Sequence, residues 1–189
     1  MNAQHSAKSC EHGSPTEALE LARYTLGRID LDPASSSYWN THTVRATRYF
    51  DRRANGLKQA WAGLVWLNPP GADEDAGTDS LVRPFWERLV EQWRGGAIEG
   101  AVYHGYSLEQ LSMLQSSPMS PLRCITLVYA RRLRHLRATR GGPPVPGDSP
   151  THASFTTLLT NRRFDSIARQ QIARFVERGS RLGQLLRPL

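Results

Sequence analysis

Cysteine, lysine and long apolar runs are all scarce in this sequence. Its two cysteines, Cys10 and Cys124, are too few and too far apart for a disulfide framework, so we expect two free thiols. The histidines and cysteines do not follow zinc-ligand spacing, so we expect no metal site. No apolar run approaches the roughly 18 residues of a membrane helix, and the N-terminus lacks the apolar segment of a secretory signal. These absences predict a cytoplasmic chain without a membrane partner.

Positive charge is abundant, and nearly all of it is arginine. The net charge is +7, and Lys8 and Lys58 are the only lysines among 24 basic residues. A basic surface attracts polyanions, nucleic acid first, although charge alone is a weak signal. The 189 residues fit one domain that can bury a substantial core. We expect a disordered tail over residues 1–13 and a single domain over residues 14–189.

Apolar spacing and turn residues predict alternating helices and strands. Ser14-Pro15-Thr16-Glu17 predicts a helix start with Ser14 as the N-cap, and Gly27 should end that helix. A short helix is expected near 43–47, a turn at Asn55-Gly56, and a flexible surface loop over the Gly/Pro run 141–147. The remaining predicted strands cover about 28–32, 64–67, 99–104, 124–129 and 153–160, and the remaining helices about 81–94, 108–114 and 163–186.

This alternation favours an α/β fold with helices on the faces of a sheet. The strands 124–129 and 153–160 flank the Gly/Pro run, so we expect them to form an antiparallel hairpin at the sheet edge. The rest of the sheet is expected to be mostly parallel. In open sheets of this kind, ligands bind beside the carboxyl ends of the strands.

Two predicted strand ends carry residues suited to chemistry. Asp30 and Asp32 end the strand that Pro33 breaks, and a carboxylate there can hold the ribose or amino group of a nucleoside cofactor. Asn68 ends the strand 64–67 and is followed by Pro69-Pro70-Gly71. Because an Asn amide offers both a donor and an acceptor, a rigid Asn can hold an exocyclic amine and orient its lone pair toward an electrophile.

Asn-Pro-Pro at a strand end resembles the catalytic motif of amino-methyltransferases, which transfer a methyl group from S-adenosylmethionine to an amine nitrogen. From about Ser14 to Leu159 the chain further resembles the phage-type DNA N6-adenine methyltransferase family. Asp32 and Asn68 lie 36 residues apart, a family-like distance. The other matching segments, in the family's order, are Ser14-Pro15-Thr16, Leu31-Asp32-Pro33-Ala34-Ser35, Tyr49-Phe50, Asn55-Gly56-Leu57, Trp61-Ala62-Gly63, Arg123-Cys124, Arg131-Arg132 and Asp148-Ser149-Pro150-Thr151-His152.

The resemblance implies a Rossmann-like three-layer methyltransferase fold, S-adenosylmethionine as cofactor and DNA as partner. The target adenine would have to leave the base stack to be methylated. The arginines Arg131, Arg132, Arg134 and Arg137 would form a stripe that contacts phosphates. The cofactor-binding candidates are Pro15, Thr16, Asp30, Asp32, Pro33 and Ala34, and the catalytic candidates are Asn68, Pro69 and Pro70.

Gly71 departs from the family, which more often has an aromatic residue there, usually tyrosine. Stacking of such a ring on a base contributes about 1–3 kcal/mol. Tyr103 and Tyr106 are candidates to supply the missing ring, and His152 is a further candidate for the site. Three alternatives stay open: a catalytically degenerate relative that binds only DNA or cofactor, an amino-methyltransferase with a non-DNA substrate, and a non-enzymatic basic DNA-binding protein.

Overall fold

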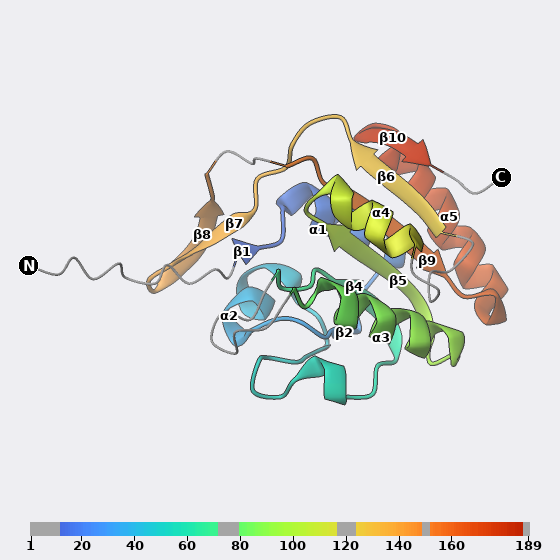
Figure 1. Ribbon diagram of the computed structural model, residues 1–189, viewed down its shortest axis with the longest axis horizontal. Coiled ribbons are helices and arrows are strands. Elements are labelled where there is room, and N and C mark those ends of the chain that lie inside the picture. The colour runs from blue at the N-terminus through green and yellow to red at the C-terminus, as the bar shows by residue number, and fades with distance from the viewer. Residues whose placement is uncertain (1–11, 72–79, 117–123, 149–151, 187–189) are drawn as a thin grey trace, which may run out of the picture.

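The computed structural model describes residues 12–71, 80–116, 124–148 and 152–186 of the chain. They form a mixed α/β protein with one seven-stranded sheet and one three-stranded sheet, shown in Figure 1. The strand order of the large sheet is β10-β6-β9-β5-β4-β2-β3. Its strands are β2 (Leu31–Asp32), β3 (Arg48–Tyr49), β4 (Gly63–Leu67), β5 (Ile98–Gly105), β6 (Cys124–Tyr129), β9 (Phe155–Thr160) and β10 (Gly183–Leu186).

The large sheet is parallel on one side and antiparallel on the other. Strands β3, β2, β4 and β5 run parallel, whereas β9, β6 and β10 pair antiparallel to their neighbours. The α/β class is therefore confirmed, and the expectation of a mostly parallel sheet is wrong. Strands β6 and β9 do pair antiparallel as expected, but β10 covers β6 and is itself the edge.

Strand β10 replaces the end of the predicted C-terminal helix. The helix α5 (Asp165–Gly179) stops at a buried glycine, and the chain then returns along β6. Gly183 pairs with Tyr129, and a side chain at this glycine would collide with the backbone of β6. Close backbone approach of this kind requires glycine. The helix expected up to residue 186 is therefore too long.

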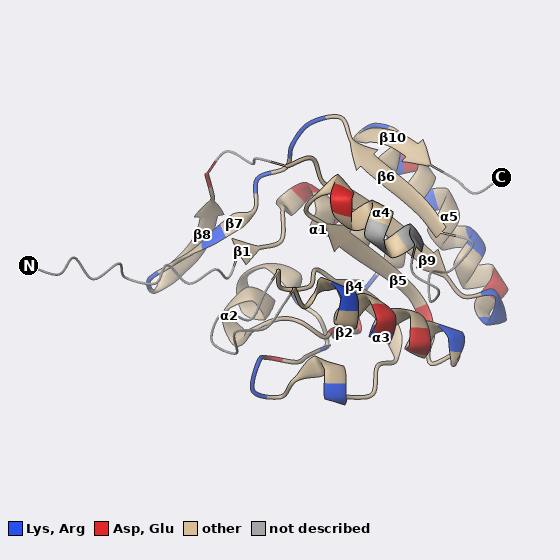
Figure 2. Ribbon diagram, viewed as in Figure 1, with Lys and Arg blue, Asp and Glu red and all other residues tan. Residues whose placement is uncertain are grey.

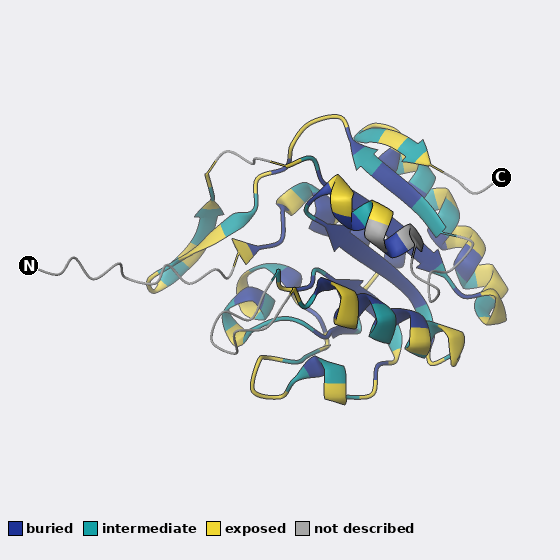
Figure 3. Cartoon of the chain, viewed as in Figure 1, coloured by how far each residue is buried: buried dark blue, intermediate teal, exposed yellow. Residues whose placement is uncertain are grey.

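Helices cover both faces of the large sheet. On one face, α1 (Thr16–Leu26) and α5 pack against Trp66 and Val102. On the other, α3 (Val82–Arg94) and α4 (Leu108–Ser116) pack against Val65 and Tyr103. Because successive residues of a strand point to opposite faces, β4 and β5 contribute to both cores. Figure 3 shows the resulting buried centre.

The first helix starts one residue later than a Ser14 cap requires. Pro15 occupies the N-cap with an extended backbone (ψ 139°), and the helix begins at Thr16. The hydroxyl of Ser14 is instead bonded to the side chain of Asn68. The predicted end is confirmed, because Gly27 adopts φ 82° at the C-cap.

The segment between β2 and β4 is partly helical. Instead of a short helix at 43–47, the chain forms α2 (Ser37–Trp39) and a π-helical turn η1 (Asn40–Val44), with Ser36 capping α2. The Asn55-Gly56 turn is confirmed, since Asn55 is left-handed (φ 53°) before the short 3-10 helix η2 (Gly56–Lys58). This segment forms one wall of the site described below.

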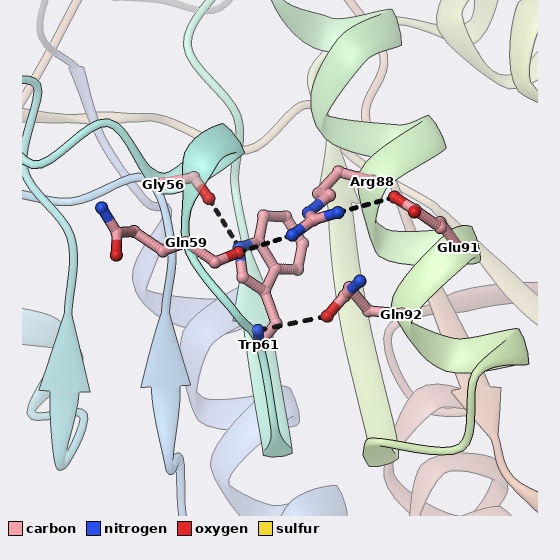
Figure 4. Close-up of polar contacts among 6 residues, drawn as sticks. All are labelled: Gly56, Gln59, Trp61, Arg88, Glu91 and Gln92. Carbon is pink, nitrogen blue, oxygen red and sulfur yellow. Dashed lines mark hydrogen bonds and ion pairs between the residues drawn. The ribbon is translucent and has the colours of Figure 1, made fainter.

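A set of polar contacts, drawn in Figure 4, ties the start of β4 to α3. The indole of Trp61 donates to the carbonyl of Gly56 at 2.7 Å, and Arg88 donates to the carbonyl of Gln59 at 2.8 Å. The side-chain oxygen of Gln92 accepts the backbone N–H of Trp61 at 3.3 Å. These bonds hold the entry to β4, at whose other end Asn68 lies.

The small sheet joins β1 (His12–Gly13), β7 (Leu136–Thr139) and β8 (Gly142–Pro146) in the order β1-β7-β8. The Gly/Pro run is therefore a strand and not a loop. Its prolines are tolerated because β8 is an edge strand. His12 and Gly13 were expected within a disordered tail, yet they pair with β7. Residues 1–11, including Cys10, lie outside the described residues.

Candidate functional site

Two strand ends meet at one small pocket. Strands β2 and β4 are parallel neighbours, with Leu31 opposite Val65, so Asp32 and Asn68 leave the sheet at the same edge. The pocket between them, here called the Asp32 pocket, has a volume of about 30 Å³. It is lined by His12, Gly13, Ser14, Asp32, Ala34, Ser35, Trp39, Val44 and Asn68.

Asp32 is a buried carboxyl group without a cationic partner among the described residues. Its side chain is 3% exposed, and its Oδ1 accepts the backbone N–H of Ala34 at 3.1 Å. Burial raises the pKa of Asp32 to about 7, and the hydrogen bond from Ala34 opposes that shift.

Asp30 lies outside the Asp32 pocket. Its carboxylate forms an ion pair with Arg28 at 2.7 Å and accepts the backbone N–H of Leu64 at 2.9 Å. Leu64 lies near the start of β4, whereas the pocket lies at the end of that strand. Both of Asp30's oxygens are already bonded, and the structure does not bring it together with Asp32 as a ligand group.

Asn68 is held by a hydrogen bond that sequence reasoning missed. Its Nδ2 donates to the hydroxyl of Ser14 at 3.1 Å, and Ser14 is 5% exposed. The bond orients the amide, and no other described residue forms a side-chain hydrogen bond with Oδ1, which is thus left as an acceptor. Pro69 is buried and Pro70 exposed. Because the serine lies just before a helix, its sequence context predicts a capping role and carries no signal for a hydrogen bond to Asn68.

Tyr106 lies against Gly71. A Cβ atom added to Gly71 would lie 3.3 Å from the tyrosine hydroxyl, which is tighter than ordinary contact. Tyr106 directly follows β5, is half-buried, and donates its backbone N–H to Gln110 at 3.2 Å. Because Gly71 has no side chain, the hydroxyl of Tyr106, the residue after β5, can lie close to the Asn-Pro-Pro turn.

Tyr103 is not available as a base-stacking ring. It is fully buried, with ring centroids 5.2 Å from Trp86 and 5.9 Å from Phe155. Burial raises the pKa of its hydroxyl, as expected for a core tyrosine. The predicted role fails because Tyr103 lies inside β5, which continues to Gly105, and not at its end.

The other cofactor candidates flank the pocket without all lining it. Ala34 lines it, and buried Pro33 lies between the two lining residues Asp32 and Ala34. Pro15 is buried and Thr16 exposed, directly after Ser14, and neither lines the pocket. His152, the candidate before β9, is exposed and also lies outside the pocket.

The four predicted phosphate-binding arginines are exposed and lie on the β6–β7 connection and β7, where Figure 2 shows basic residues in blue. Arg131 forms an ion pair with Glu17 at 2.9 Å. In the described part of the chain, Arg132, Arg134 and Arg137 form no ion pair. They lie on the small sheet or its approach, which reaches the Asp32 pocket through β1.

Buried His104 lies close to half-buried His135. Their rings are 5.6 Å apart, and neither Nε2 atom has a hydrogen-bond partner among the described residues. Burial lowers the pKa of both, that of His135 to about 4. Across the described ranges, no group of three or more His, Cys, Asp or Glu side chains is arranged to hold a metal ion.

Comparison with known proteins adds no family assignment. A scan against models of known protein families finds no match, and a search of curated proteins finds none either. Among the helices of the described residues, none has both the length and the apolar character needed to span a membrane. The site must therefore be interpreted from its own geometry.

Proposed function

We propose that this protein is an S-adenosylmethionine-dependent amino-methyltransferase that acts on adenine N6 in DNA. The observation that carries the proposal is the convergence of Asp32 and Asn68 on one pocket at adjacent parallel strand ends. Open α/β sheets bind ligands at that edge. The resemblance of the Asn-Pro-Pro segment to amino-methyltransferases supports the choice of reaction.

The residues of the pocket suit the polar part of the cofactor. Asp32 offers a carboxyl group without a cation among the described residues, and the buried hydroxyl of Ser35 lies beside that carboxyl group. Both would bond to amino or hydroxyl groups of S-adenosylmethionine. When bound, this cofactor supplies an electrophilic methyl group.

Asn68 would hold the target amine. Because Ser14 occupies its Nδ2, its Oδ1 is left to accept one N–H of the amine. The carbonyl of Pro69 would accept the other, which directs the nitrogen lone pair away from both acceptors. A neutral aromatic amine is a poor nucleophile, so this positioning is the main contribution of the chain. Tyr106 would stack on the base beside Gly71.

The pocket must open before a whole cofactor fits. Its volume of about 30 Å³ is far below the roughly 300 Å³ of the smallest usual ligand sites. One wall consists of His12, Gly13 and Ser14, and Gly13 packs against the ring of Trp39. The cofactor would therefore enter by displacing His12 and Gly13, the two described residues of β1, while Ser14 keeps its hydrogen bond to Asn68.

A calorimetric titration combined with a methyl-transfer assay tests the proposal. The wild-type protein should give heat with S-adenosylmethionine and transfer tritiated methyl groups to unmethylated DNA. Asn68→Ala should keep cofactor binding and lose transfer, whereas Asp32→Ala should lose cofactor binding. The exposed Asp148→Ala is the matched control for lost charge. Absence of any binding of S-adenosylmethionine to the wild-type protein would sink the proposal.

A second candidate is a degenerate relative that binds DNA without methylating it. The small volume of the Asp32 pocket favours it. The same experiment separates the two, because the degenerate relative would bind DNA but give neither cofactor heat nor methyl transfer.

A further inference from the structure

The β7–β8 hairpin, residues 136–146, projects from the body of the molecule in Figure 1. Together with its approach it is strongly basic. Residues 131–148 contain five arginines and a single acidic residue, Asp148. Figure 2 shows basic residues, coloured blue, along this approach, on β7 and at the hairpin turn. The five exposed arginines are Arg131, Arg132, Arg134, Arg137 and Arg140.

Most of this charge is unneutralised within the described chain. Only Arg131 has an acidic partner there, Glu17. Arg132, Arg134, Arg137 and Arg140 form no ion pair with any residue that the structure describes. Exposed guanidinium groups without partners suit phosphates, which they bind through a planar fork of donors.

Tyr38 holds the hairpin turn in place. Its hydroxyl accepts the backbone N–H of Thr139 at 3.0 Å and donates to the carbonyl of Gly142 at 2.9 Å. The tyrosine ring is itself stacked on His42, with centroids 4.5 Å apart. At the turn, Gly141 adopts φ 74°, a conformation that favours glycine. The two hydrogen bonds of Tyr38 therefore hold the hairpin that carries the arginines.

The same anchor connects the hairpin to the Asp32 pocket. Trp39, the neighbour of Tyr38 in α2, lines that pocket. On the other side of the small sheet, β1 pairs with β7 and contributes His12 and Gly13 to the pocket wall. The hairpin therefore has a defined position relative to Asn68.

We propose that the β7–β8 hairpin is a nucleic-acid docking arm, in which Arg137 and Arg140 bind backbone phosphates and Tyr38 fixes the arm beside the Asp32 pocket. The choice of DNA as the nucleic acid rests on the proposed function. The exposed arginines are spaced along one hairpin and its approach, and most form no ion pair with a described residue. This arrangement fits a repeating phosphate chain better than the irregular carboxylates of an acidic protein. The arm would set the register of the duplex, while the target base reaches Asn68 and Tyr106 beside the pocket.

Binding of a fluorescent duplex, followed by anisotropy between 50 and 200 mM salt, tests the arm. Each phosphate contact contributes about 0.9 to the slope of log affinity against log salt. Arg137→Gln/Arg140→Gln should lower that slope by about two and raise Kd on the order of tenfold or more. The control Arg162→Gln/Arg181→Gln removes equal charge from exposed positions at the two ends of α5 and should leave both values unchanged.

Tyr38→Phe tests the anchor without changing charge. It deletes both hydroxyl bonds to the turn. The salt slope should stay at the wild-type value while Kd rises several-fold, because a loosened arm loses more freedom on binding. Circular dichroism establishes that each variant is folded. Wild-type affinity in Tyr38→Phe would refute the anchoring role.

The outcomes separate this inference from the proposed function. If the protein neither binds S-adenosylmethionine nor transfers methyl groups, yet the hairpin variant weakens duplex binding, the methyltransferase proposal fails and the arm stands. If the hairpin variant binds the duplex with wild-type affinity and slope, the arm is overturned whatever the pocket does. Equal competition by polyglutamate would also overturn it, since the arm would then recognise carboxylates.

Discussion

Replacing Asp32 by asparagine should stabilise the ligand-free protein above neutral pH. Asparagine has nearly the same shape, and its carbonyl oxygen can still accept the N–H of Ala34. It carries no charge, so it removes the cost of burying a carboxylate that has no cationic partner in the described part of the chain. The wild-type protein bears that cost for as long as the pocket is empty.

The pKa of Asp32 sets the sign and the size of the effect. In the folded protein the pKa is raised from its ordinary value of 3.8 to about 7. Between these values the folded state holds a proton that the unfolded state has lost, so wild-type stability falls as pH rises toward 7 and is level above it. At about 1.4 kcal/mol per pKa unit, the advantage of Asp32→Asn should grow by about 3 kcal/mol between pH 5 and pH 8.

Urea unfolding of both proteins at pH 5 and pH 8 measures this difference. Asp148→Asn, at an exposed position, is the control and should stay within about 0.5 kcal/mol of wild type at both pH values. The reasoning is refuted if Asp32→Asn is no more stable than wild type at pH 8, or if its advantage does not grow with pH. In calorimetry the same variant should lose affinity for S-adenosylmethionine, so stability and binding would change in opposite directions.

Four further predictions concern the neighbours of Asn68 and strand β1. Tyr106→Ala should raise KM for DNA by roughly 5- to 150-fold, the range expected for one lost stacking contact of about 1–3 kcal/mol. Gly71→Tyr should lose activity through collision with Tyr106, and the exchange Gly71→Tyr/Tyr106→Gly should restore part of it; a double variant no better than Gly71→Tyr would contradict the shared position. Ser14→Ala should lower kcat several-fold with little change in KM, whereas Ser14→Thr keeps the hydroxyl and most of the activity, which steady-state kinetics can decide. Addition of S-adenosylmethionine should speed amide exchange in β1 and at Leu136, which pairs with Gly13; unchanged exchange there would contradict opening at this wall.

Local sequence signals were sufficient to predict an element where its own residues determine whether it forms a helix or a strand. The β-branched and apolar run 124–129 matches β6 exactly in extent, and the apolar spacing of 81–94 gave α3 within one residue. Both elements bury side chains in a pattern that their own sequence displays. Parallel pairing of β2 and β4 likewise brought Asp32 and Asn68 together, as the strand-end rule predicts.

The misses arise where distant segments decide the structure. Strand β10 forms because β6 offers an unpaired edge, a fact absent from the four residues themselves. The prolines of β8 predict a loop unless the segment is known to be an edge strand, which depends on the pairing of the small sheet. The carboxylate of Asp30 accepts a hydrogen bond from Leu64 on the adjacent strand and lies outside the Asp32 pocket. The hydroxyl of Ser14 accepts one from Asn68 and lies at the pocket. The contacts of β10, Asp30 and Ser14 each span more than 30 residues of sequence, whereas β8 pairs with the adjacent strand β7.

Strand β1 belongs to both of the proposed binding surfaces. His12 and Gly13 line the Asp32 pocket, and the same two residues pair with β7 at the base of the arginine-bearing hairpin. A ligand that displaces them alters the support of the hairpin and hence its affinity for a polyanion. Linkage is reciprocal, so the polyanion must change the affinity of the pocket for that ligand by the same factor. Two residues at the start of the described chain thus create a coupling free energy between the pocket and the arm.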